Sequence, residues 1–459
     1  MTFVVAGENF TTAQTELIQE MVAAEGSANF VPKDQADQIW ILIAGFLVFF
    51  MHAGFSMLEA GSVRAKNAVN IMFKNVMTLC IGAVSYFLIG WGLAYGPNGG
   101  GFIASGDFAL SETDNTGNHG WFFQFAFCAT AATIVSGALA GRVVLGGYFI
   151  VACVMTIWIY PVVSHWVWGN GFLSAFVDPS DRPGFLGSTD ASGFVDYAGS
   201  GVVHMTGGVA ALVGAKILGP RLGRFQKLES GAYGEPLPMP GHSMTLSTLG
   251  VFILWVGWYG FNCGSTLAFD GPIASKVAVT TTLSPATAAL TGMLFGKFVK
   301  GHWDLVNTLN CVLAGLVSIT APCSVVADGY AILIGFFGAF VYMGGSALVL
   351  KLHIDDPLDA GAVHGITGIW GCLAVGLFAD DVSLQDAGFA GMTSKGTQFG
   401  IQVVGVLCIF SWVVANSLVL FLTLKVLGLL RVSADVEEAG LDASEHGGAA
   451  YELDEVTKA

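Results

Sequence analysis

The stretch "DYAGSGVVHMTGGVAALVGA", residues 196 to 215, sets a polar ring within a long apolar run. Its glycine, alanine and valine residues form a run long enough to cross a bilayer as a helix. A histidine, His204, lies near the middle of this run. A polar side chain at membrane depth needs a partner or a function. The stretch therefore predicts a transmembrane helix that carries an intramembrane site.

The rest of the chain has the same apolar character. Its 459 residues are 54% hydrophobic and only 11% charged, with a mean hydropathy of +0.68, which is typical of an integral membrane protein. We expect eleven apolar stretches to cross the bilayer, near residues 39–60, 76–96, 120–140, 145–163, 197–218, 245–266, 277–296, 303–321, 330–350, 361–379 and 399–425. The predicted fold is an all-α integral membrane protein.

The distribution of Lys and Arg predicts on which side of the membrane each terminus lies. With the N-terminus outside, all but four of the 18 Lys and Arg residues fall on the cytoplasmic side or in helix ends facing it, as the positive-inside rule requires. We expect a multi-pass protein of the plasma membrane in three parts: a polar extracellular extension (1–38), a transmembrane domain (39–428) and a cytoplasmic tail (429–459). Within the extension, "TTAQTELIQEMVAAEG" predicts a short helix. The net charge of −15 reflects an excess of acidic residues, which we interpret mainly as solvated surface residues.

Several functional classes are disfavoured by composition. The eight cysteines lie nearly all inside apolar spans and form no CxxC pair, so we interpret them as core residues, with neither disulfides nor a metal site. The sequence has no GxxxxGK loop and no soluble domain large enough for ATP hydrolysis. We therefore expect a protein that is not an enzyme or a primary pump, with no cofactor and no nucleic-acid partner.

Two segments of the chain resemble each other. "DYAGSGVVHMTGG" in the fifth predicted span and "DAGAVHGITGIWG" in the tenth share an Asp near the start, a central His and a Gly/Thr-rich continuation. Because five spans separate them, they run in opposite directions, which is typical of an inverted repeat. The pattern predicts two five-helix halves plus an eleventh helix, with His204 and His364 meeting between small residues that allow close approach. The alternative that each histidine only satisfies a neighbouring carbonyl stays open.

Several longer motifs resemble a known family. "GFSMLEAGSVRAKNAVNIM", "WFFQFAFCA", "YPVVSHWVWGNG", "GWYGFNCGS", "DDPLDAGAVHGITGIWG" and the tail "LRVSADVEEAGLDASEHGGAAYE", together with the fifth-span motif, are similar to the ammonium transporter branch of the ammonium transporter, methylammonium permease and Rhesus family. The likeness runs from about residue 39 to about residue 453. It implies a homotrimer with one pore per subunit, a lipid membrane environment, ammonium or ammonia as the substrate, and a PII-type regulatory protein as a possible cytoplasmic partner.

The resemblance also implies roles for residues near the outer mouth. Phe127, Trp168 and Ser265 are implied to capture the cation, and aromatic faces and a hydroxyl oxygen suit that task. Asp196 is implied to support this vestibule through backbone hydrogen bonds without touching the substrate, as an Asp at a helix N-terminus can. A direct role for Asp196 as a cation ligand stays an alternative.

Further residues are implied to form the narrow part of the pore. Phe127 and Phe261 are expected to stack as a gate, above the pair of His204 and His364. The resemblance places Trp258, Asn262 and Thr281 beside this path, and Pro285 predicts a kink in the seventh span. The implied function is capture of ammonium, its deprotonation, and conduction of ammonia past the gate and the histidines.

Two other functions remain open from the sequence. Paired intramembrane histidines also ligate haem in membrane redox subunits. An ammonium sensor is the other alternative. Only about 30 residues follow the last predicted span, so a sensor would signal through a cytoplasmic partner.

Overall fold

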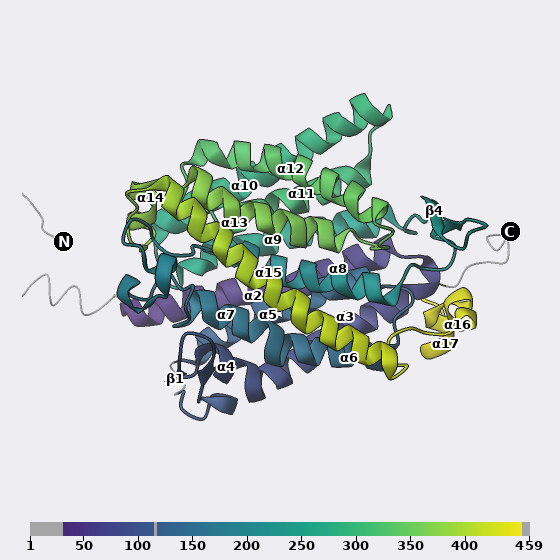
Figure 1. The fold of residues 1–459 in the computed structure, drawn as a ribbon, viewed down its shortest axis with the longest axis horizontal. Coiled ribbons are helices and arrows are strands. Elements are labelled where there is room, and N and C mark those ends of the chain that lie inside the picture. The colour runs from purple at the N-terminus through teal and green to yellow at the C-terminus, as the bar shows by residue number, and fades with distance from the viewer. Residues whose placement is uncertain (1–30, 114–116, 452–459) are drawn as a thin grey trace, which may run out of the picture.

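The computed structural model describes residues 31–113 and 117–451, which form a bundle of long helices (Figure 1). Within these residues, ten helical stretches are long and apolar enough to cross a membrane, and one shorter apolar helix, Leu305–Thr320, lies at the position of the eighth predicted span. The chain is therefore a multi-pass, mostly helical membrane protein. The helix predicted within the first 26 residues lies outside the described residues.

The spanning elements are α2 (Lys33–Ser62), α3 (Ala68–Ser85) with η2 (Tyr86–Gly90) and α4 (Trp91–Tyr95), α5 (Asn118–Leu139), α6 (Leu145–Val154) with η4 (Met155–Ile159) and α7 (Tyr160–Trp168), η7 (Ser200–Met205) with α8 (Thr206–Leu218), α9 (Met244–Cys263), α10 (Gly271–Phe295), α11 (Leu305–Thr320), α12 (Asp328–Lys351), η10 (Gly361–Ile366) with α13 (Thr367–Phe378), and α15 (Lys395–Val426). The shorter helices are η1 (Ala65–Asn67), η3 (Phe108–Leu110), η5 (Pro179–Asp181), η6 (Gly184–Gly187), η8 (Gly264–Thr266), η9 (Gly296–Lys300), α14 (Asp381–Asp386), α16 (Ala434–Ala439) and α17 (Leu441–Glu445). Two small antiparallel hairpins, β1 (Asn98–Gly99) with β2 (Ala104–Ser105) and β3 (Phe225–Lys227) with β4 (Tyr233–Pro236), lie at the ends of the bundle.

The first helix begins earlier than its apolar run. The predicted span starts at residue 39, whereas α2 starts at Lys33, directly after Pro32. Lys33 and Asp37 form an ion pair of 2.8 Å one turn apart, and Asp34 lies in the first turn, where a carboxylate favours the helix dipole. Hydropathy marks where the apolar surface begins, whereas the helix itself begins earlier, at Lys33. The seventh predicted span corresponds to α10, one helix from Gly271 to Phe295. Pro285 lies inside this helix and does not end it.

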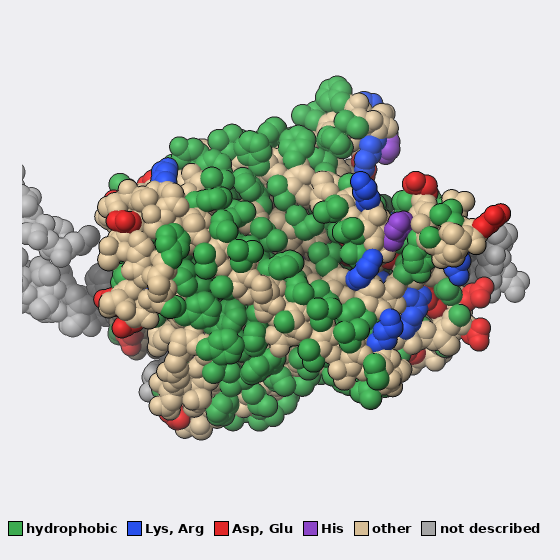
Figure 2. All heavy atoms as spheres, in the orientation of Figure 1, with side chains coloured by type: hydrophobic (Ala, Val, Ile, Leu, Met, Phe, Trp, Pro, Cys, Tyr) green, Lys and Arg blue, Asp and Glu red, His purple; other side chains and the backbone are tan. Residues whose placement is uncertain are grey.

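The bundle has a buried centre and an apolar exterior. The helix α5 is buried from Phe125 to its end, whereas fewer than half of the residues of α3 and α15 are buried. Figure 2 shows hydrophobic side chains over the middle of the molecule, and most of the visible Lys and Arg side chains gather at the end that carries α16 and α17. An exposed apolar band of this kind suits contact with lipid.

Two central helices approach each other through their backbones. A Cβ atom added at Gly208 in α8 would lie 2.0 Å from the backbone nitrogen of Gly365, and one added at Gly368 would lie 2.5 Å from the carbonyl oxygen of Ser200. The contacts run antiparallel, because the earlier residue of one segment meets the later residue of the other. Only glycine permits this approach, which brings the two histidine-bearing segments together.

The C-terminal tail packs against the basic end of the bundle. The carboxylate of Asp442 accepts hydrogen bonds from the backbone nitrogens of Val69 (3.0 Å) and Asn70 (2.9 Å), which begin α3. The backbone nitrogen of Leu441 donates to the side-chain oxygen of Asn67 over 3.0 Å. The tail thus supplies a cap for a helix that begins more than 370 residues earlier.

Candidate functional site

The centre of the site is a pair of buried histidines. Nδ1 of His204, in η7, and Nδ1 of His364, in η10, lie 3.2 Å apart, and their rings are 20° from parallel. The two rings are 0% and 4% exposed. One Nδ1 donates and the other accepts, so the hydrogen bond requires a proton on one of these two nitrogens at a time. The two residues that were matched in the repeat therefore meet inside the bundle.

Both histidines lie on π-helical segments with matching starts. A residue with positive φ precedes each histidine by five positions, Gly199 at 111° and Asp359 at 54°. Eight positions before His204, Asp196 accepts from the backbone nitrogens of the segment that follows, and eight before His364, Asp356 accepts from the nitrogen of Gly361 over 2.7 Å. π-Helical turns of this kind are frequent at functional sites.

This geometry corrects one part of the sequence comparison. The matched segments align Asp196 with Asp359, but the capping counterpart of Asp196 is Asp356. The Asp359 carboxylate instead accepts from the hydroxyls of Tyr342 and Ser346, each over 3.0 Å. Counting residues back from each histidine, rather than aligning the visible motifs, would have found the correct pair.

An aromatic stack leads from one side to the histidines. The rings of Phe127 and Phe261 are stacked with centroids 3.9 Å apart and are 1% and 0% exposed. The ring of His204 stacks on Phe261 at 5.4 Å and on Trp258 at 4.9 Å. The indole nitrogen of Trp258 donates to Thr320 over 2.9 Å, which fixes its ring beside the histidine. Phe261 and Trp258 therefore stack directly on His204, and Phe127 stacks on Phe261 one ring further out.

An outer cavity of about 340 Å³ lies beyond this stack. Phe127, Trp168 and Ser265 all line it, as the resemblance implies. Trp168 meets Phe127 edge to face at 5.9 Å, and its indole nitrogen donates to the carbonyl oxygen of Asp196 over 2.7 Å. The Ser265 hydroxyl donates to the carbonyl of Phe261 over 2.8 Å, which leaves its oxygen able to accept a hydrogen bond from a ligand.

Sequence reasoning missed other side chains of this cavity. Two carboxylates, Asp270 and Asp386, and the polar side chains of Gln124 and Tyr197 also line it. Their negative charge and acceptor oxygens suit a cation. Asp270 also caps α10 by accepting from the backbone nitrogen of Ile273, so its position before an apolar run was a usable signal.

Asp196 supports the cavity without lining it. Its carboxylate is 3% exposed and accepts from the backbone nitrogens of Gly199 (3.0 Å), Gly201 (2.9 Å) and Val202 (2.8 Å). Its carbonyl holds Trp168, as described above. These bonds use the carboxylate to order the start of the π-helical segment.

Asn262 and Thr281 lie together but away from the outer cavity. The side-chain nitrogen of Asn262 donates to the hydroxyl of Thr281 over 3.0 Å, and both residues are fully buried. This bond joins α9 to α10. The Asn262 side-chain oxygen has no hydrogen-bond partner among the described residues.

A second, small cavity lies on the other side of the histidine pair. Its volume is about 20 Å³, which is room for roughly one water molecule. It is lined by His364 together with Glu59, Thr133 and apolar side chains. With the two Nδ1 atoms bonded to each other and so little space beside them, the pair does not fit around a haem.

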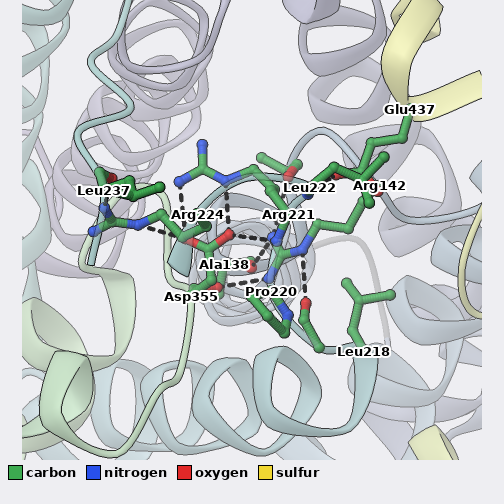
Figure 3. Close-up of polar contacts among 12 residues, drawn as sticks. Ala138, Arg142, Leu218, Pro220, Arg221, Leu222, Arg224, Leu237, Asp355 and Glu437 are labelled. Atoms are coloured by element: carbon green, nitrogen blue, oxygen red, sulfur yellow. Dashed lines mark hydrogen bonds and ion pairs between the residues drawn. The ribbon is translucent and has the colours of Figure 1, made fainter. Parts of the chain in front are cut away.

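The basic end of the bundle holds a cluster of arginines around one carboxylate (Figure 3). Arg221 makes a two-pronged contact with Asp355, through Nε at 2.8 Å and Nη2 at 2.9 Å, and Arg224 forms an ion pair with it at 3.3 Å. Arg142, fully buried, donates to the Asp355 carbonyl over 2.6 Å. Burial raises the pKa of Asp355, but hydrogen bonds from Arg221 and the charge of Arg142 hold it well below its usual range.

The neighbouring Asp356 has the opposite shift. Burial, and then the charge of Asp359, raise the pKa of Asp356 from 3.8 to about 7 despite the backbone hydrogen bonds that it accepts. The pKa values of the two adjacent carboxylates thus shift in opposite directions, and only Asp355 accepts hydrogen bonds from an arginine side chain.

Together, the fold and the site define a class: a multi-pass membrane protein with a buried pair of histidines between an aromatic-lined cavity and a second, smaller cavity. The model of the Ammonium Transporter Family matches residues 39–451, and the chain belongs to this family. This confirms the resemblance drawn from the sequence.

Individual relatives agree with this assignment. The chain is 42% identical over 444 residues to ammonium transporter 1 member 3 of Solanum lycopersicum, covering 91% of this chain and 94% of the relative. It is 40% identical to ammonium transporter 3 of Dictyostelium discoideum, covering 97% and 100%. Among solved structures, it resembles a sensor Amt protein (TM-score 0.80, 32% identity, 90% and 98% covered) and Candida albicans Mep2 (TM-score 0.76, 28% identity, 87% of each chain). The curated relatives are transport proteins rather than enzymes.

Proposed function

We propose that this protein transports ammonium across the membrane. The cation is captured in the outer cavity by Phe127, Trp168 and Ser265 and then loses a proton. Ammonia passes the gate of Phe127 and Phe261 and the pair of His204 and His364. The observation that carries this proposal is the hydrogen bond between the two histidine Nδ1 atoms, at 3.2 Å, on the path between the two cavities.

Selectivity for ammonium over potassium follows from the proton that only ammonium can lose. Potassium resembles ammonium in size and charge, but it has no proton to lose and no N–H group to donate. Carrying an intact cation through an apolar segment is costly, whereas neutral ammonia crosses at little cost. A pore that removes the proton before its narrowest part therefore excludes potassium.

The gate supports this order of events. The stacked rings of Phe127 and Phe261 leave no open water column between the outer cavity and His204, since both are almost fully buried. Cation–π attraction strengthens as the ammonium loses its water shell against Phe127 and Trp168. Deprotonation then releases a neutral molecule small enough to pass when the rings move. Asn262, Thr281 and Trp258 hold the walls of this passage.

The proposed architecture has eleven crossings, arranged as two inverted five-helix halves and a last helix, with α11 as the short eighth crossing. The domains are the extension (1–38), the transmembrane domain (39–428) and the tail (429–459). We propose the plasma membrane as its location. Its N-terminus lies outside in this proposal, because most of the visible basic residues gather at the end that carries the tail (Figure 2). It acts as a homotrimer without a cofactor, and a PII-type protein docks on its cytoplasmic face.

The test of the proposed function is an electrical recording. Purified protein in a planar membrane is expected to carry current with ammonium and none above background with potassium at the same concentration. An equal response to both ions would contradict the proposal. Ammonium uptake without any current would leave transport intact and show net ammonia conduction.

Sensing is the second candidate, and the likeness to a sensor Amt protein favours it. In that case the binding of ammonium would change how the C-terminal tail packs against the basic end of the bundle. Uptake by the purified protein separates the two functions, because a sensor alone moves no nitrogen across the membrane.

We expect Trp168→Leu and Ser265→Ala each to weaken capture at low ammonium while leaving the protein folded. Each removes a contact worth roughly 1–2 kcal/mol, which corresponds to an increase of about 5- to 30-fold in the half-saturating concentration. Concentration-dependent uptake measures this change. Trp303→Leu, at an exposed site far from the cavity, is the matched control. An unchanged concentration dependence in both variants would rule out this capture site.

We expect truncation after Val432 to impair transport or PII docking. It removes Glu437 and Asp442, and with them a carboxylate bonded to Arg431 over 2.7 Å and the cap of α3. A chain that ends at Tyr451 keeps both contacts and is the control. Uptake and co-purification with a PII-type protein are the measurements. Full activity together with undiminished PII binding in the shorter chain would refute this prediction.

A further inference from the structure

A buried carboxylate lies beside the inner cavity and has no role in the path described so far. Glu59, near the end of α2, is 1% exposed and lines the same cavity of about 20 Å³ as His364. The hydroxyl of Thr133 also lines it and has no hydrogen-bond partner within the described part of the chain. An unpaired buried hydroxyl indicates a place for a small polar guest. The cavity thus offers an acceptor and a hydroxyl to a molecule of the size of water or ammonia.

One serine, Ser136, links this carboxylate to the cationic side chain of Lys74. The Ser136 hydroxyl donates to Oε2 of Glu59 over 2.8 Å, and the Ser136 carbonyl accepts from Nζ of Lys74 over 3.3 Å. Lys74 is fully buried and lies 4.9 Å above the ring of Tyr148. A buried carboxylate is costly unless it is hydrogen-bonded and near a compensating charge. Ser136 and Lys74 supply both, and Glu59 also lines the cavity, so its carboxyl group is within reach of a molecule held there.

We infer that Glu59 is the group that returns the proton to ammonia on the cytoplasmic side of the histidine pair. This inference rests on the proposed function. The proton that leaves ammonium passes to His204 and His364, and one molecule in the inner cavity carries it from His364 to Glu59. Ammonia that reaches this cavity accepts it there.

The step balances without any other reactant. On arrival, a water molecule in the inner cavity takes the proton from His364 and gives one to the carboxylate of Glu59, which gains an O–H bond, and the histidine pair returns to its neutral form. On departure, that O–H bond breaks as the lone pair of ammonia forms a fourth N–H bond. The carboxylate is regenerated beside a newly formed ammonium ion, and the two opposite charges favour release of the proton from oxygen. One nitrogen and one positive charge leave for the cytoplasm.

The test compares charge with nitrogen in the same vesicles. Current on a supported membrane gives the charge moved, and uptake of ¹⁵N-labelled ammonium gives the nitrogen moved. Glu59→Gln keeps the size of the side chain and an acceptor for Ser136, but it cannot carry the proton. We expect its ratio of charge to nitrogen to fall at least tenfold while nitrogen uptake stays within threefold of the parental value. Glu229→Gln, at an exposed turn, is the matched control and should keep the parental ratio.

The outcomes separate this inference from the proposed function. A parental ratio in Glu59→Gln overturns the inference, and so does a parallel loss of current and uptake, which a structural role would produce. In both cases the parental protein still transports ammonium. If the parental protein moves neither charge nor nitrogen, the proposed function fails and the inference falls with it. If Glu59→Gln does not fold, Thr133→Val decides: a ratio lowered at least threefold supports the inference, and an unchanged ratio overturns it.

Discussion

The double variant His204→Gln with His364→Gln is expected to assemble normally and to lose ammonium-dependent current by at least about 100-fold, since proton transfer by a positioned side chain is worth that much or more. Glutamine is polar and similar in reach, so two glutamines can hydrogen-bond to each other across the 3.2 Å contact. A glutamine amide does not exchange a proton as an imidazole does. The two rings cannot easily both be charged in this buried site, but one shared proton can move between them.

The measurement is current in a membrane with ammonium and then potassium, with size-exclusion chromatography as the check on assembly. His302→Gln, at an exposed loop, is the matched control and should behave as the parental protein. A single acidic replacement at either position is expected to retain part of the current, because a carboxyl group also accepts and releases a proton. Parental current in the double variant, with potassium still excluded, would show that the histidines only pack the core.

The second large effect is expected from Asp355→Asn. This change leaves Arg221 and Arg224 without the carboxylate that they bind, and removing one partner of a buried pair costs about 3–5 kcal/mol. The fully buried Arg142 keeps its hydrogen bond to the carbonyl of residue 355 but loses the nearby negative charge. Thermal unfolding in mild detergent measures the loss as a lower Tm. Asp328→Asn, in the exposed first turn of α12, is the control and should change stability by no more than about 0.5 kcal/mol.

The pH dependence has a definite sign. The pKa of Asp355 is depressed in the folded protein, so its contribution to stability is complete above its ordinary value of 3.8 and is lost as the pH falls below it. The difference in Tm between the parental protein and Asp355→Asn should therefore be largest near neutral pH and shrink on acidification below about pH 4. A difference that grows on acidification would mean that the carboxylate is not the group that the arginines stabilise.

The sequence predicted the spans better than the site. Hydropathy identifies α2 and α15 because burial in lipid requires apolar surface, but it places the start of α2 at residue 39 because Lys33 and Asp37 are polar. The pairing of His204 with His364 follows from the repeat. The π-helical turns do not, since a pattern search assumes one helical period throughout and cannot detect one additional residue in a turn.

Contacts between distant parts of the chain could also not be predicted from the sequence. Nothing near Asp355 in the sequence indicates Arg142 or Arg221, and nothing near Asn70 indicates that Asp442 caps its helix. Glu59 had a visible signal, an acid inside the motif "GFSMLEAGS", but its cavity is formed by side chains from several helices. Such sites depend on tertiary packing, which one sequence does not specify locally.

The matching starts of η7 and η10 have a consequence for the direction of transport. Each histidine follows a capping Asp by eight residues and a left-handed residue by five, and the two segments meet antiparallel through Gly208 and Gly365. The backbone at the centre is therefore nearly the same from either face, but the side chains are not: aromatic rings stack on His204, and Glu59 lines the cavity beside His364. The backbone favours neither direction, and the concentration gradient and the voltage decide which way nitrogen moves. The side chains on the two sides set how fast nitrogen enters from each side, but not where its net movement stops.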